Sequence, residues 1–161
     1  MDFAVEQCSD HFEYKYHSYK TMLFRIAYMY MENVHDTEDI LQKAFLKLYE
    51  CKKTFASAED EKRWLIRITI NLCKAEKRSF WNRKRQYMDE LPEQAESEND
   101  RMVQMALSEL PDKYKSCIYL HYIEGYSVIE MADILHISES SVKMRLKRGR
   151  EKLKLELEEI V

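Results

Sequence analysis

Apolar residues recur every three or four positions through the first half of the chain, the spacing of helices that bury one face. We expect a first helix over residues 14–31, a second that starts at an N-cap on Asp36, and a third that Ser57 caps. Together they predict one helical domain over residues 1–86. The positions expected in its core are Tyr19, Leu23, Ile26, Ala27, Tyr30, Ile40, Leu41, Ala44, Phe45, Leu48, Trp64, Leu65, Ile68 and Leu72.

The helical pattern stops over residues 87–100, whose sequence is YMDELPEQAESEND. This segment is acidic and has few large apolar groups, the composition of a solvated linker. Helical spacing returns in residues 101–161, which we expect to form a second domain. Its first two helices are predicted before and after Pro111, and the second of them runs to about Ile123.

The rest of the second domain has the pattern of two helices joined by a short turn. Ser127 and Glu130 have the spacing of a capping box, His136 and Ile137 form the turn, and Ser138 caps a last, basic helix. This order is typical of a helix-turn-helix. The predicted fold class is therefore all-α: two small helical domains joined by an acidic flexible linker, the C-terminal one a helix-turn-helix.

Composition agrees with a helical chain. Among the 161 residues there are 2 Gly and 2 Pro, too few for the turns of an all-β fold. No run free of Asp, Glu, Lys and Arg is longer than the one at residues 116–123, so no membrane span is predicted. The N-terminus lacks the pattern of a secretion signal, and we expect a soluble cytoplasmic protein.

The net charge of −3 conceals two basic clusters, at residues 74–85 and 143–154. In the last helix, Val142, Leu146 and Gly149 should face the domain. The other side is then polar and basic, as in a recognition helix that enters the major groove of DNA; a merely solvated basic face is the alternative. Its residues are Ser140, Ser141, Lys143, Met144, Arg145, Lys147 and Arg148.

Two further surfaces are candidates for binding. The helix after Asp36 should expose Leu46 among polar residues, either as an anchor for another protein or as an isolated surface leucine. Residues 77–85, KRSFWNRKR, interleave cations with rings, a pattern that favours single-stranded nucleic acid. Trp81 would equally well pack on the first helix.

Catalysis has little support in the sequence. Asp36, Glu38 and Asp39 are neighbours in a first helical turn, where capping already explains them. Cys117 and His121 are four residues apart and lack a second ligand pair for a metal. We therefore expect no catalytic residues, no metal and no cofactor. A small metal-dependent nucleic-acid enzyme that uses the three carboxylates remains an alternative.

Three segments together resemble the extracytoplasmic-function (ECF, group IV) sigma factors of the sigma-70 family. They are DTEDILQKAFLKLYE at residues 36–50, RWLIRITINLCKAEKR at 63–78, and LPDKYKSCIYLHYIEGYSVIEMADILHISESSVKMRLKRGREKL at 110–153. The resemblance implies a bacterial transcription initiation factor that promotes promoter opening and performs no bond chemistry itself. Its implied partners are core RNA polymerase, at the β′ clamp and the β flap, and promoter DNA.

The resemblance also implies roles for individual residues. The polymerase-binding positions are Asp39, Gln42, Lys43 and Leu46. Those for the minus-ten element are Arg67, Asn71, Lys74, Lys77 and Arg78, with the loop at 54–60 forming a pocket for a flipped base near Asn71. Those for the minus-thirty-five element are Ser140, Ser141, Lys143, Met144, Arg145, Lys147 and Arg148.

Two residues depart from the family pattern. Lys43 stands where an acidic residue is usual, and His136 where the turn often has glycine. Many family members act in stress responses under an anti-sigma protein, often one that holds them at the membrane, so such a protein is an optional further partner. The main alternative is a helix-turn-helix regulator that binds DNA without polymerase; it leaves the N-terminal domain without a purpose.

Overall fold

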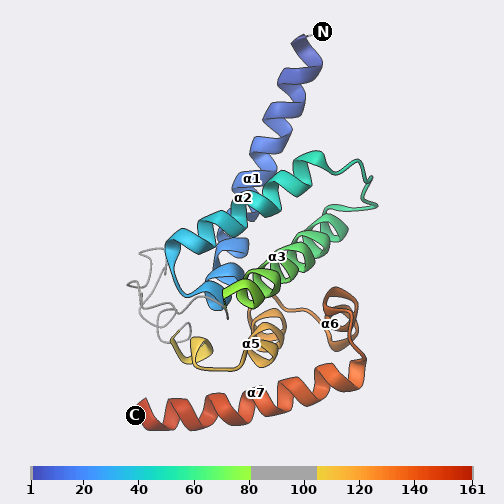
Figure 1. Ribbon diagram of the computed structural model, residues 1–161. Helices are drawn as coiled ribbons and strands as arrows, with labels where there is room; N and C mark the ends of the chain where they lie inside the picture. The colour runs from blue at the N-terminus through green and yellow to red at the C-terminus, as the bar shows by residue number, and fades with distance from the viewer. Residues whose placement is uncertain (1, 81–104, 161) are drawn as a thin grey trace.

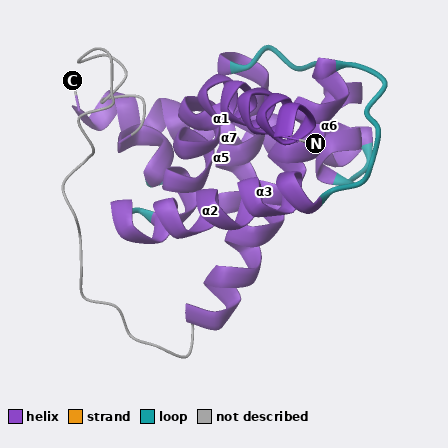
Figure 2. Ribbon diagram, turned by 90° about the horizontal axis from the view of Figure 1, so that it is seen from above, coloured by secondary structure: helices purple, strands orange, loops and turns teal. Residues whose placement is uncertain are grey.

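The computed structural model describes the backbone of residues 2–80 and 105–160, and the side chains of residues 11–79 and 105–154. Every regular element in these ranges is a helix, as Figure 2 shows, which confirms the all-α prediction. None of these helices has both the length and the apolar character needed to cross a bilayer. The predicted linker at residues 87–100 lies outside the described residues, as does Trp81.

Three helices form the N-terminal domain: α1 (Asp2–Met31), α2 (Val34–Glu50) and α3 (Ala58–Phe80). They pack against one another in all three pairs (Figure 1). The first helix begins well before residue 14, where the prediction started it. The loop between α2 and α3 covers residues 51–57, and Ser57 caps α3 as predicted, because its Oγ accepts the N–H of Asp60 at 3.2 Å.

The start of α2 differs from the prediction. Its N-cap is Asn33, whose Oδ1 accepts the Asp36 N–H at 2.8 Å, while its Nδ2 donates to Asp36 Oδ2 at 2.5 Å. Asp36 is thus the third residue of the helix and not its cap. Glu32 explains the difference: it takes a left-handed conformation with φ 60°, which ends α1 sharply and makes Asn33 the first extended residue.

The predicted core is confirmed on α2 and, apart from the half-buried Tyr19, on α1, and it is shifted on α3. Leu65 is buried as expected, but Trp64, Ile68 and Leu72 are only half-buried. The helix packs against α1 and α2 on one side and against α6 on the other, so it buries more than one stripe. The additional buried apolar residues of α3 are Ile66, Ile70 and Cys73.

The C-terminal domain follows the predicted order. After a helical turn at residues 105–108 come α5 (Asp112–Ile118), a π-helical continuation η1 (Tyr119–Ile123), α6 (Val128–Leu135) and α7 (Glu139–Ile160). The sequence predicted α5 and η1 as one helix and did not predict its wider last turn.

The helix-turn-helix prediction is confirmed, except that only the serine half of the predicted capping box forms, since the Glu130 carboxylate pairs with Arg63. Ser127 Oγ accepts the Glu130 N–H at 3.2 Å, and Ser138 Oγ accepts the Ser141 N–H at 3.1 Å. His136 ends α6 with φ 53° and ψ 46°, the left-handed conformation that glycine adopts more cheaply. Each helix of the pair therefore begins on a serine cap, and the turn between them is fixed.

A glycine allows α7 to lie close to α5. A Cβ added at Gly149 would be 2.8 Å from Ile118 Cγ1 and 3.4 Å from Tyr114 Cβ, and both neighbours are buried. With Val142 and Leu146, which are also buried, Gly149 forms the inward side of α7 that the sequence predicted.

The two domains are in contact. The start of α3 and the helix α6 lie side by side, and α1 contacts α5. Figure 1 shows α5 and α6 between α3 and α7, so that α7 forms the side of the molecule farthest from α1 and α2.

Candidate nucleic-acid and protein interfaces

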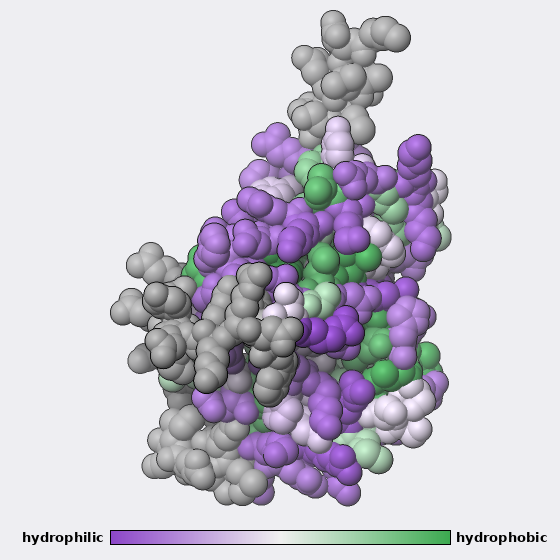
Figure 3. All heavy atoms as spheres, viewed as in Figure 1, coloured by the Kyte–Doolittle hydropathy of each residue, from purple (hydrophilic) through white to green (hydrophobic). Residues whose placement is uncertain are grey.

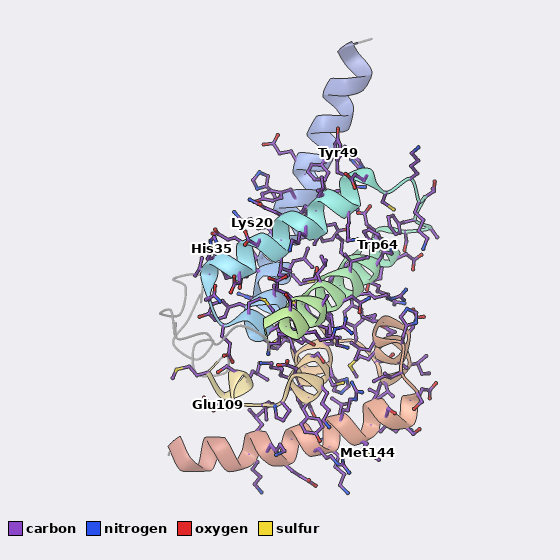
Figure 4. All side chains as sticks on the ribbon, in the orientation of Figure 1. Lys20, His35, Tyr49, Trp64, Glu109 and Met144 are labelled. Atoms are coloured by element: carbon purple, nitrogen blue, oxygen red, sulfur yellow. The ribbon has the colours of Figure 1, made fainter. Side chains whose placement is uncertain are left out.

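The outer side of α7 is an open cationic surface. Lys143, Lys147 and Arg148 are exposed, and Met144 is 52% exposed and points away from the rest of the molecule in Figure 4. Ser140 is exposed as well, whereas Ser141 and Arg145 are half-buried. Among the described side chains, no ion pair involves Lys143 or Lys147. The structure thus brings the predicted DNA-reading residues to one accessible helix.

The predicted minus-ten residues lie along α3 in two different environments. Asn71, Lys74 and Arg78 are exposed. Arg67 is half-buried and donates from Nη2 to the Asp133 carbonyl at 3.1 Å. Lys77 donates to both carboxylate oxygens of Asp112; these side-chain contacts are 2.9 and 2.7 Å long. Two of the five predicted residues are therefore held by the C-terminal domain.

A cavity of about 660 Å³ lies beside the loop between α2 and α3. Thr54, Phe55 and Ser57 line it from the loop, and Tyr19 lines it from α1. Burial, followed by a hydrogen bond to Glu61, raises the pKa of Tyr19 to about 12, so this ring keeps its hydroxyl proton at neutral pH.

Asn71 does not line this cavity. It lies thirteen residues beyond Ala58, the first residue of α3, which corresponds to about 20 Å along a helix axis. The structure therefore does not bring the two parts of the expected base pocket together. No sequence pattern pointed to Tyr19 as a lining residue, because it comes from a different helix.

The predicted polymerase-binding positions share one exposed side of α2. Asp39, Gln42, Lys43 and Leu46 are all exposed, and Leu46 has 55% of its surface accessible. Lys43, the departure from the family pattern, lies 3.6 Å from Glu76 of α3. Its charge is therefore partly offset by a carboxylate within the chain.

An apolar groove that was not predicted from the sequence lies next to these residues. It lies between α1 and α2 and has a volume of about 440 Å³. Phe12 and Tyr16 come from α1, and Tyr49, 65% exposed, comes from the end of α2 (Figure 4). Tyr49 is one helical turn from Leu46 and extends the apolar surface. The residues that line the groove are Phe12, Tyr16, Lys20, Phe24, Glu38, Leu41, Gln42, Phe45, Leu46 and Tyr49.

A second exposed apolar group lies on the C-terminal domain. Figure 3 shows hydrophobic residues gathered near α6 on a face that is otherwise largely hydrophilic. Ile129 of α6 is 67% exposed, and Tyr122 and Ile123 of η1 are also exposed. Exposed apolar side chains that gather on one face favour contact with another protein.

Of the carboxylates considered for catalysis, Asp36 is engaged in local structure, whereas Glu38 and Asp39 are exposed. Ligand atoms of His35, Asp36 and Asp39 lie within 4.8 Å of one another. Asp36, however, is buried and bonded to the N-cap Asn33, and Glu38 is not part of the cluster. His121 Nδ1 lies 2.7 Å from the Tyr126 carbonyl oxygen. Capping accounts for Asp36, and turn formation accounts for His121.

Family models match both parts of the chain. Sigma-70 region 2 matches residues 16–83, and sigma-70 region 4 matches residues 100–153. The class of protein that the fold and the surfaces define is therefore a two-domain sigma factor.

Among curated proteins, the chain is 32% identical to the ECF RNA polymerase sigma factor SigW of Bacillus subtilis, over 88% of this chain and 86% of SigW. It is 27% identical to SigX of the same bacterium, over 91% and 84% of the two chains. The chain belongs to the ECF RNA polymerase sigma factors, which direct transcription initiation at promoters.

A solved structure has the same arrangement of helices. The sigma factor RpoE from Bartonella quintana, crystallised with the anti-sigma factor NepR, matches with a TM-score of 0.77 at 21% identity over 92% of this chain and 97% of that one. This likeness supports the fold.

Proposed function

We propose that this chain holds core RNA polymerase through α2, reads duplex promoter DNA through α7, and captures the opened minus-ten strand through α3 and the cavity beside residues 51–57. The observation that carries the proposal is the exposed Leu46, which lies at the rim of an apolar groove on the helix that resembles the clamp-binding helix of the family. An accessible apolar anchor beside a groove is a typical centre of a protein interface.

The further assignments follow from the same surfaces. The minus-ten residues are Arg67, Asn71, Lys74, Lys77 and Arg78, and the minus-thirty-five residues are the seven named on α7. The apolar group of Tyr122, Ile123 and Ile129 supports a second contact, with the β flap. The domain boundaries at residues 86 and 101 remain predictions. The chain would perform no bond chemistry and would act in the cytoplasm together with the polymerase. An anti-sigma factor is a further candidate partner.

The test is binding of core polymerase and transcription from a promoter library. Gln42 and Leu46 lie one turn apart on the exposed side of α2, so Gln42→Ala with Leu46→Ala should weaken binding in a pull-down while thermal unfolding stays nearly unchanged. Lys47→Ala, at an exposed position of the same helix, is the matched control. If the full chain neither binds core polymerase at micromolar concentration nor adds to its transcription, a polymerase-independent DNA-binding regulator replaces this function.

A further inference from the structure

Met144 is the one large apolar side chain that α7 exposes over residues 139–154, the part of the helix whose side chains the structure describes. It is 52% exposed and points away from the rest of the molecule (Figure 4). Val142 and Leu146 of the same stretch are buried, and Leu153 is half-buried. A single exposed apolar residue is common on protein surfaces, so exposure alone assigns no role to it. Its position among the neighbouring side chains indicates one.

The neighbours of Met144 on the helix surface are polar or cationic. Ser140 lies one turn before it, and Lys147 and Arg148 lie one turn after it; all three are exposed. Lys143, the preceding residue, is exposed as well. Met144 therefore lies in the middle of the cationic face and not at its edge, where it would be expected if it only extended the core.

Met144 also lies in the part of α7 that a helix-turn-helix inserts into DNA. It is the sixth residue of the helix, about 7.5 Å along the axis from Glu139. The start of the helix is fixed, because Ser138 Oγ accepts the Ser141 N–H at 3.1 Å. The N-terminal residues of a recognition helix are those that contact base edges in the major groove. The side chain of Met144 is thus placed to meet a base.

The thioether side chain limits which group of a base it can meet favourably. Most atoms that the base pairs present in the major groove are hydrogen-bond donors or acceptors. Methionine has no donor and only a weak acceptor, so covering such an atom would remove its water without replacing the hydrogen bond. The C5-methyl group of thymine is the apolar exception in this groove. A flexible, polarisable methionine packs well against such a group.

We propose that Met144 reads the C5-methyl group of a thymine in the minus-thirty-five element, while the cations around it attract the DNA backbone. The inference rests on the proposed function, because it needs α7 to enter the major groove, and it adds the base and the chemical group that are recognised. Burial of one methyl group corresponds to about a fourfold change in affinity. Met144 therefore selects thymine at one position by packing and not by a hydrogen bond.

The first measurement finds the position of the thymine. The full chain, alone and bound to core polymerase, selects duplexes from a library of random sequence, and the bound fraction is sequenced. The natural chain should enrich thymine at one position. Met144→Ala should lose that preference and keep the preferences at the other positions. Met105→Ala is the matched control, because Met105 is 54% exposed and lies outside α7; it should select the same sequences as the natural chain.

The second measurement removes the methyl group alone. In the enriched duplex, deoxyuridine replaces the thymidine at that position, which keeps the hydrogen-bonding groups of the base and deletes the C5-methyl. The natural chain and Met105→Ala should bind the deoxyuridine duplex about fourfold more weakly in fluorescence anisotropy. Met144→Ala should bind the two duplexes equally. Its thermal unfolding should match that of the natural chain, because the side chain is exposed.

The outcomes separate this inference from the proposed function. Equal binding of the thymidine and deoxyuridine duplexes by the natural chain overturns the inference. A fourfold difference that Met144→Ala retains also overturns it, because another residue then contacts the methyl group. Both results leave the reading of duplex DNA by α7 intact. If no sequence is enriched with or without core polymerase, that reading fails as well, and the inference fails with it.

Discussion

The two basic helices of this chain, α3 and α7, differ in how accessible their cationic side chains are. On α7, Lys143 and Lys147 project into solvent and no ion pair with a described residue holds them. On α3, Arg67 and Lys77 are bound to the other domain. Both helices look alike in composition. The difference shows that a cluster of cations in the sequence marks only a candidate nucleic-acid surface, because the packing around it decides whether the cations are accessible.

The cause is the number of sides that each helix buries. One stripe of α7, with Val142 and Leu146, faces its domain, whereas Lys143, Met144 and Lys147 on the other side are exposed. In contrast, α3 has its own domain on one side and α6 on another, so some of its basic side chains fall at a domain boundary. Four predictions test how far this contrast holds.

The largest expected effect is the salt dependence of duplex binding by the full chain without polymerase. If the open side of α7 neutralises about three to four phosphates, log affinity should fall against log salt with a slope of roughly −3 to −4. That corresponds to about a hundredfold loss between 50 and 200 mM salt. Fluorescence anisotropy with labelled duplex DNA measures it. A slope near zero would remove the contrast, because the open surface would then not serve DNA.

A matched pair of alanine substitutions sharpens the contrast. Lys147→Ala should cost about 1–3 kcal/mol of duplex binding on particular sequences if the side chain reads a base. Arg67→Ala in the same assay should change duplex affinity little, because its guanidinium is bonded to carbonyls of α6. An equal loss of duplex affinity in the two variants would contradict the conclusion that Lys147 is accessible to DNA and Arg67 is not. An equal loss from Lys147→Ala on every sequence would make it a phosphate contact.

Alkaline pH should weaken the fold through the buried thiol of Cys73. Its pKa is 9.0 in the unfolded reference and about 12 in the folded chain, so the folded state binds the proton more tightly. The stabilisation is complete below pH 9 and is lost as the pH rises towards 12. The free energy of unfolding should therefore fall by roughly 1.4 kcal/mol between pH 8 and pH 10 on account of this group. Urea unfolding measures it, and Cys73→Ala should flatten that part of the profile.

The smallest effect concerns the two left-handed residues, one in each domain. His136→Gly should raise stability by about 0.5–1 kcal/mol, because glycine adopts φ 53° without strain and the imidazole is exposed. Glu32→Gly relieves the same strain at φ 60°, but it also removes a carboxylate 4.0 Å from Lys115 Nζ. It should therefore gain less in thermal unfolding. If Glu32→Gly raised thermal stability more than His136→Gly, the Glu32 carboxylate would not stabilise the contact with Lys115.

Features that depend on neighbouring residues in the sequence could be predicted, because their physics is local. The serine caps at 57, 127 and 138 and the outward Leu46 all follow from side-chain chemistry at fixed helical spacing. The cap of α2 was predicted at Asp36 because Asn33 and Asp36 are both good caps. Which of the two residues caps α2 depends on where α1 ends, and no local sequence pattern predicts that α1 ends at Met31.

Contacts between the domains could not be predicted in this way. Arg67 binds carbonyl groups, which every residue possesses and no sequence pattern marks. Lys115 has the composition of a surface residue, yet the domain contact buries it. The cavity beside residues 51–57 is similar, since Tyr19 joins it from a helix that lies far away in the chain.

Gly149 has a consequence for the geometry of promoter reading. Because its missing side chain brings α7 against Ile118 and Tyr114, it sets the height and tilt of the recognition helix above its own domain. A methyl group at this position would meet Ile118 at 2.8 Å, and if α7 rather than Ile118 moves away, the seven proposed minus-thirty-five residues would move together. Gly149 thus sets the distance between α7 and α5, and a larger residue there would be expected to change how α7 is presented to DNA without changing any of the proposed contact residues.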